Sequence, residues 1–192
     1  MTPQRLNNIK DCAEEAHGVG HSYDDNKERQ ALRNFLSVSR PFQHFWKNYF
    51  GIQEGTVRLV DDPLGPYKVD LGLVETGKIG KDQRVHGLIE VDVFNEWGAT
   101  FPAHYSKFHV LERKLKYFKD EINPETGNPD YKYLTCTFNR THEQMCCTTR
   151  DNIEFCIKLY GVKSLWMQKV NSYDKVVRCP LDDNIHWFSR VD

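Results

Sequence analysis

The fold is decided by two stretches of sequence, YKVDLGLV at residues 67–74 and GLIEVDV at residues 87–93. Both alternate apolar side chains with other types at a period of two, which is typical of β-strands because successive side chains point to opposite faces. The apolar face carries Val69, Leu71, Leu73, Ile89, Val91 and Val93. The opposite face carries the acids Asp70, Glu90 and Asp92. The pattern predicts two neighbouring strands with carboxylates on a common face.

An antiparallel hairpin centred near Gly80 places Asp70 opposite Glu90. Directly opposed β-carbons lie about 4.5–5.5 Å apart, so the carboxylates repel one another unless a cation lies among them or some are protonated. Carboxylate oxygens, with a backbone carbonyl and water, suit Mg²⁺ or Mn²⁺ better than zinc. We therefore expect a divalent-metal site. The alternative is that the acids line the solvated face of an ordinary antiparallel sheet.

Helices and further strands are expected on both sides of this hairpin. Caps at Thr2-Pro3 and at Asp24 or Asp25, with an aromatic stripe from Pro41 that ends at Gly51, predict a helical N-terminal segment. The further strands are expected at 56–60, 131–138, 144–149, 165–170 and 175–179, and the further helices at 104–119 and 151–160, the last capped by Asp151. The whole pattern indicates an α/β (α+β) protein with a central mixed sheet of four to five strands flanked by helices.

The length of 192 residues suits a single domain. We divide it into a helical N-terminal segment (1–52), a core (53–160) and a C-terminal extension (161–192). Because the net charge is −1, any contact with nucleic acid must use a local basic patch. No apolar run of about 18 residues is present, and the N-terminus lacks the apolar region of a signal peptide. We therefore expect a cytoplasmic protein that does not contact membranes.

The cysteines form no C-x-x-C pair, so reduced and buried thiols are the first expectation. A zinc site is an alternative whose ligands would come from Cys136, His142, Cys146, Cys147 and Cys156. Their spacing matches no standard zinc site, and strand alternation would point Cys146 and Cys147 to opposite faces.

The acids of the hairpin carry a family resemblance. Asp70, followed after nineteen residues by Glu90-Val91-Asp92, resembles the core of the PD-(D/E)XK nuclease superfamily, which includes many restriction enzymes and phage endonucleases. The resemblance covers roughly residues 24 to 160. It implies a restriction-endonuclease-like fold and Mg²⁺- or Mn²⁺-dependent hydrolysis of phosphodiester bonds, in DNA more than in RNA. It also implies that Asp70, Glu90 and the Val91 carbonyl bind the metal, while Asp92 completes the coordination or positions the attacking water.

Two positions depart from the family pattern. Val69 stands where the family often has proline, which is a harmless variation, and Asp92 stands where the motif has lysine. Some restriction enzymes carry an acid there and remain active, and in some branches the lysine comes from the following helix. Lys114, in the helix expected at 104–119, is our candidate for such a relocated catalytic lysine, and Lys116 or Arg113 are alternatives.

The same segment is the most basic part of the chain. Residues 107–119 contain five basic side chains and one acidic side chain, a local charge of +4. We expect Lys107, Arg113, Lys116 and Lys119 to contact phosphates, whereas the alternative is a solvated basic face. The family often supplies a further acid from an N-terminal helix, and Glu28 is the candidate for it.

These patterns support two functional hypotheses. The first is a divalent-metal-dependent nuclease, of a kind that would suit a phage. The second is a catalytically inactive protein of the same fold that binds nucleic acid or a protein partner, which the missing motif lysine and the net charge both favour. A homodimer is compatible with either hypothesis.

Overall fold

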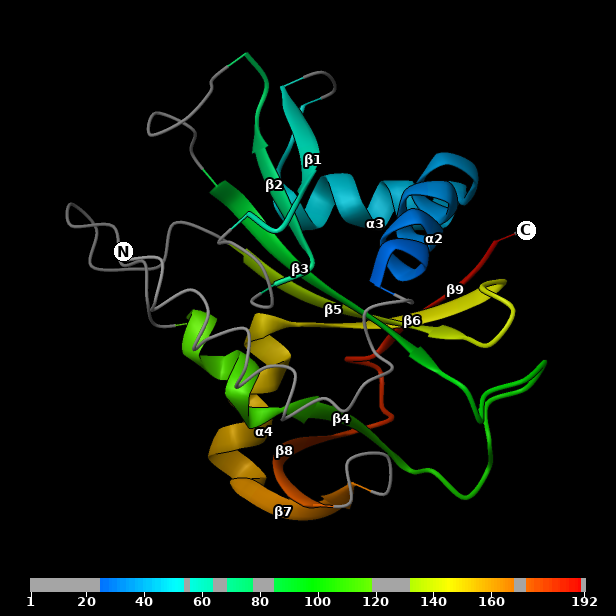
Figure 1. Cartoon of the computed structure of the whole chain (residues 1–192), viewed down its shortest axis with the longest axis vertical. Coiled ribbons are helices and arrows are strands. Elements are labelled where there is room, and N and C mark those ends of the chain that lie inside the picture. The colour runs from blue at the N-terminus through cyan, green and yellow to red at the C-terminus, as the bar shows by residue number, and fades with distance from the viewer. Residues whose placement is uncertain are drawn as a thin grey trace, which may run out of the picture.

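The computed structural model of the chain describes residues 25–53, 56–63, 69–77, 85–118, 132–167 and 172–190. It has a mixed α+β architecture in which a six-stranded sheet has the order β1-β2-β3-β5-β6-β9 and a second sheet has the order β4-β8-β7 (Figure 1). The strands of the first sheet are β1 (Val57–Asp61), β2 (Leu71–Glu75), β3 (Val85–Phe94), β5 (Lys132–Asn139), β6 (Gln144–Thr149) and β9 (His186–Ser189). The second sheet contains β4 (Lys107–Leu111), β7 (Val162–Met167) and β8 (Ser172–Pro180). The helices are α2 (Asp25–Val38), α3 (Arg40–Phe50), α4 (Arg150–Tyr160) and a 3-10 helix (Glu112–Phe118).

The aromatic stripe predicted after Pro41 forms helix α3. Phe42, Trp46 and Phe50 recur every four residues and are buried on one side of the helix. The helix ends at Gly51, whose left-handed backbone (φ 66°) lets its N–H donate to the carbonyl of Lys47 at 2.9 Å. The bounds of α2 and α3 confirm this part of the helical N-terminal segment, while the helix expected from Thr2 and Pro3 lies outside the described residues.

The predicted hairpin register is confirmed. Strands β2 and β3 are antiparallel, with Leu71 opposite Ile89 and Gly72 opposite Leu88. Asp70 directly precedes the first pair of this ladder, and its side chain accepts the N–H of Val91, so it lies next to the part of β3 that contains Glu90. Strand β3 then pairs in parallel with β5, and parallel neighbours need a long crossover connection. The chain between β3 and β5 contains β4 and the 3-10 helix, so the basic segment belongs to this crossover.

Each face of the large sheet is covered by a separate apolar core. Helices α2 and α3 cover one face, and α4 and the second sheet lie on the other side (Figure 1). The first core contains Phe35, Phe42, Leu71, Ile89, Val91 and Phe138, and the second contains Val69, Leu88, Trp97, Phe108, Tyr133 and Ile153. Glu90 alternates with Leu88 and so belongs to the face of the second core. The face with the acids is therefore covered over much of its length, rather than solvated throughout.

The prediction of a helix at residues 104–119 is wrong. Residues 107–111 form strand β4, which pairs with β8, and residues 112–118 form the 3-10 helix. Phe108 and Val110 are both buried, which is the period of two that a strand requires. Pairing with β8, about seventy residues later, selects the strand over the helix.

Three smaller expectations also need correction. The main sheet has six strands rather than four to five, because the short β9 pairs with β6. Val69 packs in the second core rather than beside Leu71, because β2 begins only at Leu71 and the alternation does not reach back to residue 69. The cap of α4 is Thr149, whose Oγ1 accepts the N–H of Asn152, and not Asp151. None of the described helices combines the length and apolar character needed to cross a membrane.

Candidate active site

Asp70 lies at a bend directly before β2, and both its backbone and its side chain are held. Its carbonyl accepts the N–H of Asp62 at 3.1 Å. Its Oδ2 accepts the N–H of Val91 in β3 at 2.8 Å, and its Oδ1 lies 3.9 Å from Nη2 of Arg29. The side chain is 20% exposed, so the carboxylate lies at the boundary between the protein and solvent.

Glu90 is a carboxylic acid in a largely buried position. Burial raises its pKa to about 8, an effect that the charge of Lys114 opposes and the charges of Asp70 and Asp92 reinforce. Its Oε2 is buried and has no hydrogen-bond partner among the described residues. A buried carboxylate oxygen without a partner is costly. Such an oxygen is therefore free to accept a proton, a donor or a cation.

Lys114 comes from the 3-10 helix and forms an ion pair with Glu90. Its Nζ contacts Oε1 of Glu90, and the two side chains are only 17% and 16% exposed. Lys114 lies in the crossover between β3 and β5, and the structure places it beside the acid although the expected helix is absent. The ammonium group thus lies on the second-core face, against a carboxylate that would otherwise be buried alone.

The other two proposed ligands follow Glu90 in β3. The N–H of Val91 donates to Asp70, and because the N–H and C=O of a strand residue point to the same edge, the Val91 carbonyl also faces the side of Asp70. Asp92 is exposed, and its Oδ1 accepts the N–H of Val93 at 2.8 Å. In the described parts of the chain, no three His, Cys, Asp or Glu side chains are grouped closely enough to hold a metal ion. The roles of Val91 and Asp92 stay predictions.

Helix α2 presents an arginine to Asp70. Arg29 donates to both carboxylate oxygens of Asp62, at 2.9 and 2.7 Å, and its guanidinium faces Asp70. Glu28 is half-buried one position earlier in α2. The sequence analysis missed Arg29, because its side chain reaches Asp70 only through the packing of α2 on the sheet.

The comparisons with known proteins name no family for this chain. No family model and no curated protein matches it. Among solved structures, the chain is similar to a nuclease from a fusselovirus. The two share 14% sequence identity, and the superposition covers 80% of this chain and 82% of that chain with a TM-score of 0.45.

The basic residues proposed for nucleic-acid contact are spread over two elements. Lys107 is exposed on β4, and Arg113 is exposed on the 3-10 helix. Lys119 and the side chain of Lys116 lie outside the described residues. The register of the second sheet adds a residue that the sequence analysis missed, since Arg178 of β8 lies opposite His109 of β4.

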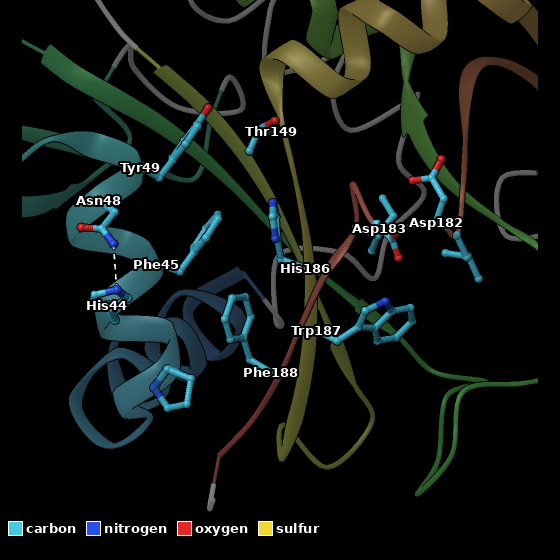
Figure 2. Close-up of a pocket in the computed structure, with 13 residues that line it drawn as sticks. His44, Phe45, Asn48, Tyr49, Thr149, Asp182, Asp183, His186, Trp187 and Phe188 are labelled. Atoms are coloured by element: carbon cyan, nitrogen blue, oxygen red, sulfur yellow. Dashed lines mark hydrogen bonds between the residues drawn. The ribbon is translucent and has the colours of Figure 1, made fainter.

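An open groove of about 890 Å³ lies elsewhere, between α3 and β9 (Figure 2). Aromatic rings form much of its wall, and they belong to Phe45, Tyr49, His186, Trp187 and Phe188. Its lining also includes Asp182 and Asp183, but no described lysine or arginine. None of the candidate acids lines this groove, and it offers no cationic side chain to a phosphate. We therefore do not assign the groove to the site around Glu90.

Proposed function

We propose that this protein is a divalent-metal-dependent nuclease that hydrolyses phosphodiester bonds in DNA. The observation that carries the proposal is the contact between Lys114 and Glu90 beside Asp70. Lys114 would thereby take over the role of the lysine of the PD-(D/E)XK motif, which is replaced by Asp92 in this chain. Two carboxylates and an ammonium group, each from a different segment, are the side chains that hydrolysis of a phosphodiester needs.

We propose Mg²⁺ or Mn²⁺ as the ion on the chemical type of the donor atoms at this site. The buried Oε2 of Glu90 has no hydrogen-bond partner among the described residues, and the Val91 carbonyl faces Asp70. Carboxylate and carbonyl oxygens are the ligands these ions prefer. Asp70, Glu90 and the Val91 carbonyl would hold the ion, and Asp92 would complete the coordination. When bound, a divalent cation acidifies a water molecule and compensates the charge of the phosphate.

The protein side chains then have distinct roles. Glu90 must lose its proton to serve as a ligand, and Lys114 favours that loss because its positive charge stabilises the carboxylate. As the phosphate gains negative charge, the ammonium group of Lys114 lies close enough to Glu90 to be shared between carboxylate and phosphate. Asp70 keeps its orientation through the Val91 N–H.

The proposed DNA-binding surface is the outer face of the second sheet together with the 3-10 helix. Phe108 and Val110 of β4 point into the second core, so Lys107 and His109 alternate with them and point outward. Arg178 lies opposite His109 on the same face. Burial and the charges of Arg178 and Lys107 lower the pKa of His109, which favours the neutral form of this histidine. Lys107, Arg178 and Arg113 would contact phosphates.

A cleavage assay tests the proposal. Linear, nicked, branched and single-stranded DNA, and RNA, are incubated with the protein in Mg²⁺, Mn²⁺ or a chelator. We expect Asp70→Asn, Glu90→Gln and Lys114→Met to lower the rate by roughly 100-fold or more, since several kcal/mol of transition-state stabilisation are removed. Glu96→Gln, at an acid that is 60% exposed, is the control and retains the rate. Equal cleavage by the wild type and Asp70→Asn would remove the assigned site.

Binding is tested separately by the salt dependence of DNA affinity. Each phosphate contact that is lost reduces the slope of log K against log salt by about 0.9 for duplex DNA. We expect Lys107→Gln and Arg178→Gln each to do so, while Lys47→Gln, at an exposed lysine of α3 on the other side of the large sheet, leaves the slope unchanged. A slope that none of these variants alters would exclude this surface.

A non-catalytic nucleic-acid binder is the second candidate function. It is favoured by the internal neutralisation of the acids, because Lys114 pairs with Glu90 and Arg29 faces Asp70. Charge balance at the site therefore does not require a metal. Calorimetric titration with Mn²⁺ distinguishes the two candidates: the nuclease requires saturable binding that Glu90→Gln abolishes, and the inactive binder predicts none, with salt-sensitive DNA affinity retained.

A further inference from the structure

Helix α2, the end of β1 and Asp70 are joined by a chain of polar contacts. Asp62 follows β1, and the guanidinium of Arg29 donates to both of its carboxylate oxygens, at 2.7 and 2.9 Å. Two parallel hydrogen bonds of this kind fix orientation as well as distance. The backbone N–H of Asp62 in turn donates to the carbonyl of Asp70 at 3.1 Å. Asp62 therefore connects the arginine to the backbone of the candidate metal ligand.

Asp62 also has an unusual backbone conformation. Its φ is 47°, in the left-handed region that non-glycine residues seldom adopt and that aspartate adopts more readily than most. Such a conformation persists only where the surrounding contacts enforce it. Here the bidentate Arg29 contact and the hydrogen bond to Asp70 supply those contacts on either side of the residue.

The burial of Arg29 distinguishes its contact with Asp62 from an ordinary ion pair on the protein surface. Its side chain is 11% exposed, and its Nε is buried without a hydrogen-bond partner among the described residues. Arg33, one turn later in α2, forms a similar pair with Asp61 at 2.9 Å, but these side chains are 29% and 54% exposed. The Arg29 guanidinium also approaches Asp70, with Nη2 3.9 Å from Oδ1. The two pairs thus share their chemistry and differ in burial and in this approach.

We infer that Arg29 and Asp62 are positioning residues that fix the carboxylate of Asp70 for the reaction. Asp62 holds the backbone of Asp70, Arg29 faces its Oδ1, and the Val91 N–H binds its Oδ2. Groups that orient a metal ligand in this way alter metal affinity or activity about 10–100-fold when they are removed. The consequence for the reaction rests on the proposed function, whereas the geometric effect on Asp70 does not.

The Val91 amide gives a readout that needs no enzymatic activity. This N–H donates to the side chain of Asp70, so its hydrogen exchange reports whether that carboxylate is in place. We expect Arg29→Met and Asp62→Asn to accelerate exchange at Val91 about fivefold or more, the equivalent of one net hydrogen bond. Arg29→Lys keeps the charge but loses the two-pronged contact, and it also accelerates exchange.

Arg33→Met is the matched control. It removes an arginine–aspartate pair from the same helix, and exchange at Val91 stays at the wild-type rate. Melting temperatures are recorded for all variants, and Asp62→Asn serves if Arg29→Met does not fold. Exchange at Val91 that is unchanged in Arg29→Lys and Asp62→Asn, or equally accelerated in Arg33→Met, would overturn the inference.

The same variants separate this inference from the proposed function. If Mn²⁺-dependent cleavage is present, Arg29→Met and Asp62→Asn weaken the apparent Mn²⁺ affinity about 10–100-fold and Arg33→Met does not. If the wild type cleaves nothing while Val91 exchange follows Arg29 and Asp62, the nuclease proposal fails and the positioning of Asp70 stands. Cleavage and Mn²⁺ affinity that are unaffected by Arg29→Met would remove the role in the reaction.

Discussion

At the scale of single residues, the raised pKa of Glu90 makes stability depend on pH. Because the pKa is about 8 in the folded protein and near 4.5 for a free glutamate, the folded state holds a proton that the unfolded state has lost between these values. This contribution is fully present below about pH 4.5 and is lost as pH rises through 8. We expect the free energy of unfolding of the chelator-treated protein to fall over this range, by about 1.4 kcal/mol for each pKa unit at most.

Denaturant titrations at several pH values measure this dependence. Glu90→Gln cannot titrate, so the decrease between about pH 5 and 8 becomes smaller than in the wild type. The exposed Glu96 provides the control, and Glu96→Gln keeps the wild-type profile. A wild type and Glu90→Gln with the same profile would show that Glu90 ionises normally in the folded state.

Lys114 shifts the same titration in a predictable direction. Its positive charge lowers the pKa of Glu90, so Lys114→Met raises that pKa further and moves the titration to higher pH. The carboxyl of Glu90, labelled with ¹³C, is followed by NMR against pH in both proteins. A pKa of Glu90 that stays the same or falls in Lys114→Met would contradict the ion pair.

At the scale of elements, the packing of α3 on β3 depends on a glycine. A Cβ added at Gly87 would clash with the ring of Phe50, which is itself held between Trp46 and Tyr49. We expect Gly87→Ala to destabilise the fold by about 1–3 kcal/mol, as overpacked cores do. Gly98 has open space at the same position, so Gly98→Ala is the control. Chemical denaturation of both variants measures the difference, and equal stabilities would mean that α3 does not pack closely on β3.

The sequence predicts elements well where the deciding contacts are local or repeat within one strand. Strand β6 has the expected bounds, β3 contains the whole stretch 87–93, and the alternation of β3 gives the correct hairpin register. The prediction for residues 104–119 is wrong because the apolar residues there fit a helix and a strand about equally well. Pairing with β8 selects the strand. Strand β9 was missed because it has four residues and is stabilised by pairing with β6.

The candidate site likewise has parts that the sequence predicts and parts that depend on tertiary packing. The proximity of Asp70 and Glu90 follows from the register of one hairpin, so it was predictable. The contact of Lys114 with Glu90 depends on how the crossover returns over the sheet, although the local charge of residues 107–119 pointed to that segment. Arg29 carries no sequence signal of its own, because its approach to Asp70 is a product of helix packing.

At the scale of the whole molecule, the site exists only in the folded chain. Asp70 precedes β2, Glu90 lies within β3, and Lys114 lies in the crossover towards β5. Two apolar cores on opposite faces of the large sheet hold these segments in register. The unfolded chain separates the donors by many residues and cannot present them together. A ligand of this site therefore binds the folded state alone.

Because a ligand of this site binds only the folded state, the melting temperature can be used to measure metal binding. A ligand that binds only the folded state stabilises it by about 2.7 kcal/mol at a concentration 100 times its Kd. For a chain of 192 residues, 1 kcal/mol corresponds to roughly 2–4 °C in melting temperature, so saturating Mn²⁺ should raise Tm by about 5–10 °C and a chelator should reverse it. Glu90→Gln removes the proposed ionisable ligand and is expected to abolish the shift, whereas Glu96→Gln retains it. A shift that persists in Glu90→Gln would place the metal elsewhere in the molecule.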